Sequence, residues 1–318
     1  MSSSRKSRLD GSRSKRQQGA HRRYKLSRLT ATMTCQEAFR AIARGYLDDL
    51  VANQEAACDG NREALHQMRI ALTRLRAARS FFSSFISSLE WSRLKGELKW
   101  LNKHLSRARD LDVALNRLPS VDNSRPQAQS PGRIWQKTWD TSHRQLRQAL
   151  HSSRYCMLVH NASIWVENGN KSPAGAQSST ERHPSSLRTL SVRRLNRWYK
   201  KLLKQSRTLE DMNASQRHRL RIKSKRLRYA VEFFEQLFPS KHVSKVKALL
   251  KSLRKIQKCL GQLNDAEQGQ SIAITLAKSV RDDVSRWRSL FSTGQKAEKR
   301  TIETALLTFR QMAALKPF

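Results

Sequence analysis

The feature that most constrains the fold is a basic segment that occurs twice. Its first copy begins at His66 and its second at His218, 152 positions later. Between residues 66–82 and 218–234, nine of seventeen positions are identical, and both copies end in two phenylalanines. Self-similarity of this length is typical of one supersecondary unit that is used twice. We therefore expect a fold built from two related halves.

Each copy is predicted to form an amphipathic helix. At about 100° per residue, the polar and basic side chains of the first copy fall within an arc of about 80°, beside an arc of leucines. The stripes consist of Arg62, His66, Arg69, Thr73 and Arg76 in the first copy and of His218, Arg221, Lys225 and Arg228 in the second. Neither stripe contains an acid to relieve the repulsion between neighbouring cations. A row of this kind that occurs twice favours anion binding over a solvated charged face.

The overall charge also indicates a polyanionic partner. The chain has 63 Lys and Arg against 25 Asp and Glu, a formal net charge of +38. Residues 1–28 hold ten of the basic residues and one acid, so the remaining chain keeps +29. Such a chain repels itself unless nucleic acid, anionic lipid or polymeric phosphate is bound.

The hydrophobic spacing is helical throughout, and no alternating strand pattern is convincing, so the predicted fold class is all-α. We expect a disordered basic tail over 1–30 and a helical domain over 31–318. Within that domain we predict repeat one at 34–167, a linker at 168–186 and repeat two at 187–318. Shorter boundaries are a capping box at Thr34–Glu37, a helix end near Arg109–Asp112 and a polar linker from Pro119 to Gly132.

Several classes of function lack their sequence signals. The four cysteines are scattered and form no C-x-x-C pair, so neither a zinc site nor a disulfide framework is indicated; we interpret them as buried thiols of a cytoplasmic protein. No apolar run is long enough to span a membrane. The eleven glycines form no phosphate-binding loop, and no cofactor is expected. Five tryptophans lie at helical spacing among leucines and are predicted to be core residues: Trp135, Trp139, Trp165, Trp198 and Trp287.

The repeated signature resembles that of the CHAD family, whose name stands for conserved histidine α-helical domain. The resemblance rests on His-x-x-Arg followed by Lys/Arg-Arg-Leu-Arg, and on Leu-Gly-x-x-x-Asp at 260–265. It covers about 34–316. The resemblance implies two pseudo-symmetric helical bundles of about four helices each, and binding of inorganic polyphosphate in a basic central groove or pore. The chain departs from the signature at Thr73, where a cation is usual, at Ser106 in place of glycine, and at Asn264, where Arg109 of the first half fits the pattern.

The resemblance assigns the ligand-binding side chains residue by residue. The candidates are His66, Arg69, Arg74 and Arg76 in the first copy, His218, Arg221, Lys225, Arg226 and Arg228 in the second, and Lys99, Lys103, Arg254 and Lys258 on the helices that follow. Arginine offers phosphate oxygens a planar fork of donors, and lysine a compact charge. Each histidine is either a donor to phosphate, held neutral by its cationic neighbours, or a packing residue satisfied by a polar group.

The carboxylates after the third helix of each half allow two interpretations. Asp110, Asp112, Asp265 and Glu267 could form a set for metal-assisted phosphate chemistry. The favoured interpretation is that Asp110 and Asp265 pair with basic residues of the repeated helices and orient them. We therefore expect a non-catalytic polyphosphate-binding protein, which would associate with polyphosphate granules. The alternatives are a nucleic-acid-binding protein and a metal-dependent phosphoanhydride hydrolase.

Overall fold

The computed structural model describes residues 29–86, 89–116, 131–168, 186–292 and 294–318. These residues form α-helices and one 3-10 turn and contain no strand, which confirms the all-α prediction. The helices are α1 (Cys35–Ala52), α2 (Gln54–Cys58), α3 (Arg62–Phe81), α4 (Leu89–Leu115), α5 (Pro131–Leu150), α6 (Ser153–Asn168), α7 (Leu187–Ser206), α8 (Ala214–Phe234), α9 (Ser240–Ser279), α10 (Val284–Ser289) and α11 (Gln295–Ala314), with the 3-10 turn at Glu235–Leu237.

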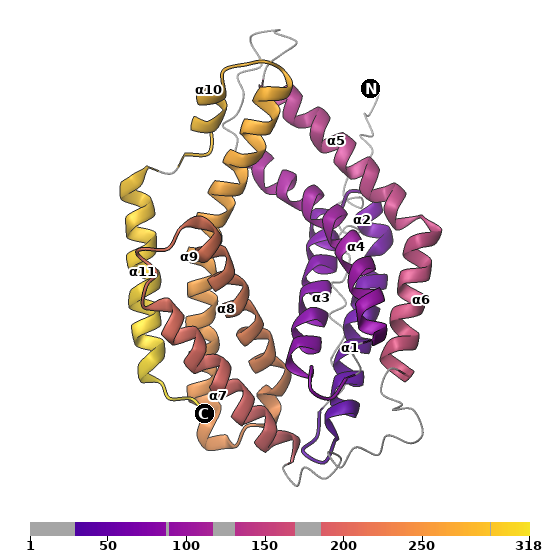
Figure 1. The fold of residues 1–318 in the computed structure, drawn as a ribbon, viewed down its shortest axis with the longest axis vertical. Coiled ribbons are helices and arrows are strands. Elements are labelled where there is room, and N and C mark those ends of the chain that lie inside the picture. Colours follow the sequence, from indigo (N-terminus) through magenta and orange to yellow (C-terminus); the bar gives the residue numbers. More distant parts are fainter. Residues whose placement is uncertain (1–28, 87–88, 117–130, 169–185, 293) are drawn as a thin grey trace, which may run out of the picture.

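The helices of the N-terminal part lie on one side of the molecule and those of the C-terminal part on the other (Figure 1). α3 packs on α1 and α4, and α8 packs on α7 and α9. The starts of α1 and α7 are 152 residues apart, as are those of α3 and α8. The spacing of the sequence repeat therefore recurs in the spacing of these helices. The assignment of whole repeats to 34–167 and 187–318 stays a prediction.

Polar caps fix where the repeated helices begin. Thr34 and Glu37 form the predicted capping box at the start of α1. Asn61 caps α3 by accepting hydrogen bonds from two backbone N–H groups, and Gly60 supplies the left-handed turn before it with a φ of 84°. Asn213 forms a second capping box at the start of α8. The first turns of both basic helices are thus satisfied without using their cations.

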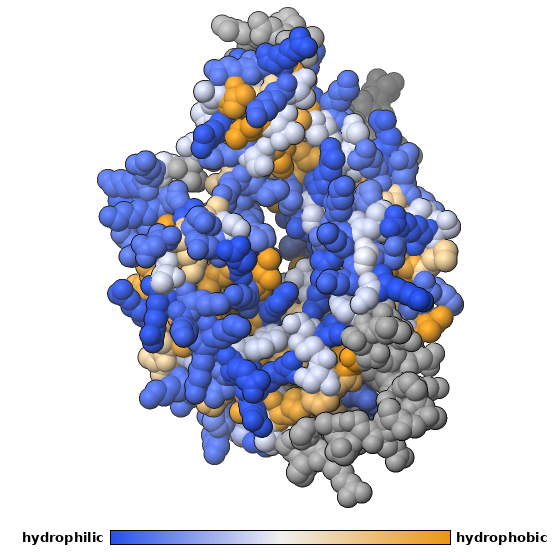
Figure 2. Space-filling view, viewed as in Figure 1, coloured by the Kyte–Doolittle hydropathy of each residue, from blue (hydrophilic) through white to orange (hydrophobic). Residues whose placement is uncertain are grey.

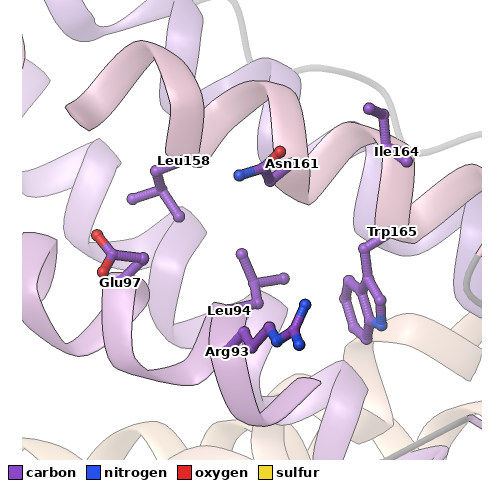
Figure 3. Close-up of a pocket in the computed structure, with 7 residues that line it drawn as sticks. All are labelled: Arg93, Leu94, Glu97, Leu158, Asn161, Ile164 and Trp165. Carbon is purple, nitrogen blue, oxygen red and sulfur yellow. The ribbon is translucent and has the colours of Figure 1, made fainter. Parts of the chain in front are cut away.

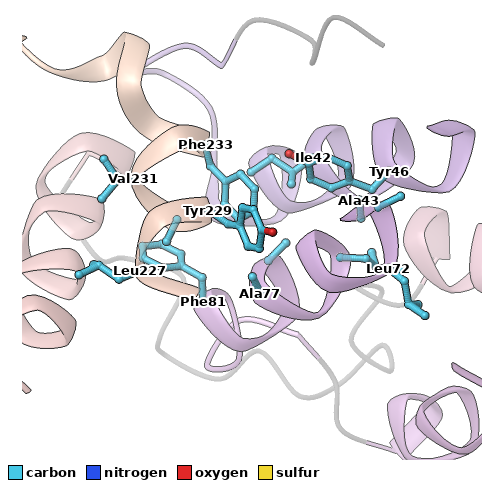
Figure 4. Packing of buried hydrophobic residues seen from close by; sticks show 14 of the residues in the cluster. Ile42, Ala43, Tyr46, Leu72, Ala77, Phe81, Leu227, Tyr229, Val231 and Phe233 are labelled. Atoms are coloured by element: carbon cyan, nitrogen blue, oxygen red, sulfur yellow. The ribbon is translucent and has the colours of Figure 1, made fainter. Parts of the chain in front are cut away.

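Aromatic packing joins the two repeated helices. Phe81 and Phe82 at the end of α3 meet Phe234 at the end of α8, with ring centroids 4.8 and 5.9 Å apart. Figure 4 shows the surrounding core, in which Tyr46 of α1 lies near Phe233. Burial of a large aromatic side chain stabilises a fold by about 1.5–3 kcal/mol. The phenylalanines at the ends of the two motif copies therefore hold the basic helices side by side.

A second, smaller core closes the far end of the molecule. There the end of α9 and α10 lie against α5 and the end of α4 (Figure 1). Trp135 of α5 and Trp287 of α10 are buried in it, and Trp165 is buried in the main core. Trp139 and Trp198 are only partly buried, so the prediction of core tryptophans is confirmed for the first three.

Several predicted boundaries differ from the structure. α4 continues to Leu115 instead of ending near Arg109–Asp112, because Leu111 and Ala114 are buried in the second core. α5 begins at Pro131, inside the predicted polar linker, since proline is well suited to the first helical position. Of the predicted tail, 1–28 lies outside the described residues, whereas Leu29 is buried in the core. Residues 169–185 of the predicted linker also lie outside the described residues.

The cysteine prediction was partly wrong. Cys58 and Cys259 are buried, but Cys35 is half-buried and Cys156 is exposed. Cys156 lies on the outer face of α6, one position after the buried Tyr155. Helical spacing places neighbouring residues about 100° apart, so one can face the core and the next solvent.

A side chain at Gly269 of α9 is expected to destabilise the protein. A Cβ at this position would lie 2.4 Å from a ring carbon of the buried Phe291, so Gly269→Ala should lower the free energy of unfolding by about 1–3 kcal/mol through overpacking. The control Gly96→Ala lies inside α4 with no atom within 4 Å of the added methyl group, and it should stabilise by up to about 1 kcal/mol. Urea denaturation followed by circular dichroism measures both. Equal effects of the two substitutions would contradict this account of the second core.

Candidate functional site

The two copies of the motif meet at a charged cluster between four helices. Arg69 of α3 donates a hydrogen bond to Asp110 of α4 at 3.2 Å. Burial raises the pKa of Asp110 and Asp265 of α9 raises it further, whereas Arg69 and Arg221 of α8 lower it. We call Arg69, Asp110, Arg221, Lys225 and Asp265 the central cluster. The predicted pairing of Asp110 with a basic residue of the repeated helices is thus confirmed, and its role in orienting Arg69 stays a prediction.

Arg221 is a partly buried member of this cluster. Burial lowers the pKa of Arg221, and the charge of Asp265 opposes that effect. Its Nε is buried without a hydrogen-bond partner among the described residues. Gly261 of α9 lies beside the guanidinium, and a Cβ there would be 3.8 Å from Nε. The guanidinium therefore keeps a donor that no described side chain uses.

Lys225 is the side chain that the cluster perturbs most. Burial, followed by the charges of Arg221, Arg69 and Arg228, lowers the pKa of Lys225 to about 7, and Asp265 partly offsets this. Crowded cations are unfavourable for the charged ammonium group, so part of the population is neutral near pH 7. A bound anion would reverse that preference. The cations of the cluster therefore repel one another when no anion is bound.

The two histidines of the motif have different surroundings. His66 is half-buried, and its pKa is lowered by burial and by the charge of Arg109. This agrees with the expectation that cationic neighbours keep the imidazole neutral. His218 is exposed, and its Nδ1 hydrogen-bonds to Oδ1 of Asn264 on α9. The departure at Asn264 therefore supplies the polar partner of the second histidine.

A second group of cations gathers around one acid, Glu232 of α8. Arg74 of α3 lies 3.1 Å from Glu232, Arg228 lies 2.9 Å from it, and Arg254 of α9 lies 3.8 Å from it. The guanidinium of Arg74 also lies over the ring of Tyr229, 5.2 Å from its centroid. The three arginines of this group thus share a single carboxylate, which offsets part of their positive charge. Sequence reasoning missed Glu232, although the position lies inside the aligned seventeen residues.

The remaining predicted site residues lie apart from the central cluster. Arg76 donates to the backbone oxygen of Leu98 at 2.7 Å, and burial and the charge of Arg226 lower its pKa. Arg226 is exposed on a different face of α8 from Arg221 and Lys225, because it is off their helical stripe. The other candidates, exposed along α4 and α9, are Lys99, Lys103 and Lys258. The structure therefore divides the predicted set into several groups.

The helices of the central cluster border a hollow in the molecular surface. Figure 2 shows this face hollowed between the side formed by α8 and α9 and the side formed by α3 and α4, with mostly hydrophilic residues around the hollow. A separate pocket of about 400 Å³ lies between α4 and α6 (Figure 3). Its Glu97 is paired with Arg154 at 2.7 Å, and Leu94, Leu158 and Trp165 form apolar walls. That pocket lacks the concentrated positive charge of the central cluster.

The acids do not assemble as metal ligands in the part of the chain that the structure describes. No group of three or more metal-binding side chains occurs there. Asp112 is buried and accepts hydrogen bonds from Trp139 at 2.7 Å and from His143 at 3.1 Å. It therefore anchors α5 to α4 and does not join Asp110. None of the described helices is long and apolar enough to cross a membrane.

Comparisons with known proteins bear on the family and the fold. The chain superposes on the crystal structure of the CHAD domain from the plant Ricinus communis with a TM-score of 0.74 and 27% identity, over 91% of this chain and 96% of that one. It also shares its fold with PptA from Streptomyces chartreusis, with a TM-score of 0.54 and 16% identity, over 88% and 99% of the two chains. No curated protein matches. The model of the CHAD domain family matches residues 41–272, most of the chain, and the protein therefore belongs to the CHAD family.

Proposed function

We propose that this protein binds inorganic polyphosphate, with the central cluster as the main contact. The observation that carries the proposal is the convergence of Arg69, Arg221 and Lys225, from both motif copies, on one partly buried site. Two carboxylates lie near these cations, but burial and the repulsion between the cations still remove part of the charge of Lys225. A bound polyanion would relieve this repulsion and restore the charge of the lysine. Polyphosphate carries roughly one negative charge per phosphate and has no base edges to read. Cations held on rigid helices suit such a ligand.

The proposal includes no catalytic step. Asp110 pairs with Arg69, and Asp112 is buried by α5, which leaves neither placed as a free metal ligand. The exposed cations of α4 and α9 would extend the contact along a flexible chain. Association with polyphosphate granules in the cytoplasm would follow from such binding.

A titration with long-chain polyphosphate at two salt concentrations tests the proposal. Affinity should fall steeply with added salt, because binding releases counterions from the ligand. Duplex DNA at the same charge concentration should not displace the ligand, and no free phosphate should appear. Displacement by DNA would instead support the nucleic-acid alternative. Metal-dependent phosphate release that disappears when Asp110 and Asp265 are both replaced by asparagine would support the hydrolase alternative.

A further inference from the structure

The repeat gives the α3–α8 pair two sides with different chemistry. On the first side, Arg74 of α3 and Arg228 of α8 share the carboxylate of Glu232. The ring of Tyr46 on α1 and the ring of Tyr229 also lie against Arg74 there. On this side, two arginines therefore share one carboxylate and pack beside two aromatic rings.

On the second side the acid is missing. A shift of 152 positions relates Arg74 to Arg226, and it relates Arg228 to Arg76 and Glu232 to Ser80. The two arginines are thus present again: burial lowers the pKa of Arg76, and the charge of Arg226 lowers it further. In place of a carboxylate, this side has only the hydroxyl of Ser80.

The second side also contains open space. The counterpart of Tyr46 is Trp198 of α7, but the counterpart of Tyr229 is the small residue Ala77. Ser80 and Trp198 line a pocket of about 160 Å³ between α3, α7 and α8. We call it the Ser80 pocket. It lies where the first side is filled by a carboxylate and a second ring.

Cations surround this pocket without compensation. Lys201 of α7 and Lys223 and Arg226 of α8 line it. The pKa of Lys223 is lowered by partial burial and then by Lys201, Arg219 and Arg226, which are all cations. Among the described residues, none of the three lining cations has a carboxylate within 4.0 Å. Gln205 also lines the pocket, and its buried Oε1 has no described hydrogen-bond partner, so rotation of the amide would present its NH₂ group instead.

We propose that the Ser80 pocket binds a single phosphate group, in the position that the Glu232 carboxylate occupies on the first side. The group is either the end of a phosphate chain or the phosphate of a small organic molecule. Arg226 and Lys223 would donate charge-assisted hydrogen bonds to its oxygens, and Ser80 a neutral one. The inference goes beyond the proposed function, because it uses a separate site and does not depend on the central cluster.

The test introduces the missing acid. Ser80→Glu places a carboxylate opposite Arg226 and should weaken binding of inorganic pyrophosphate in the pocket at least about tenfold, because the cations become neutralised from within. The readout is the ¹⁹F NMR signal of Trp198 in the full chain labelled with 5-fluorotryptophan, assigned through Trp198→Phe. In the wild type this signal should shift saturably with pyrophosphate. Arg226→Gln should weaken pyrophosphate binding in the same way, and circular dichroism verifies that each variant is folded.

The controls separate this pocket from the central cluster. Gln148→Glu adds the same charge to an exposed position of α5, which packs on α2, α4 and α6, and should leave the Trp198 response unchanged. Combined Arg69→Ala and Arg221→Ala should also leave it unchanged. The proposal is overturned if the response persists in Ser80→Glu, disappears with the central pair, or is matched by sulfate. Tighter binding of phenyl phosphate than of pyrophosphate identifies a small organic phosphate; the reverse order identifies a chain end.

Discussion

Replacing Arg69 and Arg221 together by alanine is expected to weaken polyphosphate binding at least about 100-fold. Each guanidinium supplies charged hydrogen bonds that contribute about 1.5–3 kcal/mol apiece. The dependence of affinity on salt should become shallower, because fewer counterions are released. A titration of both proteins at matched salt concentrations measures the effect.

The control variant loses the same number of positive charges, but at positions outside the central cluster. Arg144 of α5 and Arg310 of α11 are exposed, and their joint replacement by alanine should change affinity only slightly. Unpaired Asp110 can take up a proton and so avoid a buried charge, and the helical content of the variant should therefore persist. Equal losses in the two double variants would mean that net charge, and not the central cluster, decides binding.

Affinity for polyphosphate is expected to fall by about tenfold between pH 7 and pH 8.5 because of Lys225. With its pKa near 7, this ammonium group is about half protonated at pH 7 and mostly neutral at pH 8.5. A bound polyanion favours the charged form, so binding takes up a proton and weakens as pH rises. The other cations that act on Lys225 are arginines, and a guanidinium does not titrate in this range. His66, whose pKa is lowered, stays neutral in this range.

Lys225→Arg should abolish this pH dependence while it keeps the charge, because a guanidinium does not titrate below pH 12. Lys299→Arg on the exposed face of α11 serves as the matched control and should retain the wild-type profile. Calorimetry in two buffers of different ionisation enthalpy measures the proton uptake directly. If Lys225→Arg shows the same fall in affinity as the wild type, the electrostatic account of the cluster is wrong.

Much of the helical framework could be predicted from local sequence. The side chains of the capping residues Thr34 and Asn61 accept hydrogen bonds from backbone N–H groups of the first helical turn, so the helix starts are encoded locally. The repeated signature also identified the two basic helices and the family. The helix ends were less predictable. α4 extends past its expected limit because its last turn is buried against α5 and α10, and α10 lies far away in sequence.

The division of the cations into groups could not be predicted in the same way. A helical wheel places Arg221, Lys225 and Arg228 on one stripe, but it does not say which neighbour each meets. Arg228 donates hydrogen bonds to Glu232 and Gln257. Arg221 instead interacts electrostatically with Arg69 and both aspartates, and Lys225 with Arg69, Arg221 and Asp265. Electrostatic energy falls with distance and rises with burial, so the chemistry of each cation depends on helices that are remote in sequence.

By itself, then, the sequence determined an all-α chain with two basic helices, an excess of positive charge and the CHAD signature, since all of these follow from residue type and short-range spacing. Only the tertiary structure decided which cations have a carboxylate partner and which do not. It placed Glu232 among three arginines, left Lys225 with a pKa near 7, and set Ser80 beside Arg226 in an open pocket. The physical reason is that charge compensation and burial are properties of contacts between helices, and these contacts form only when the two basic helices pack side by side.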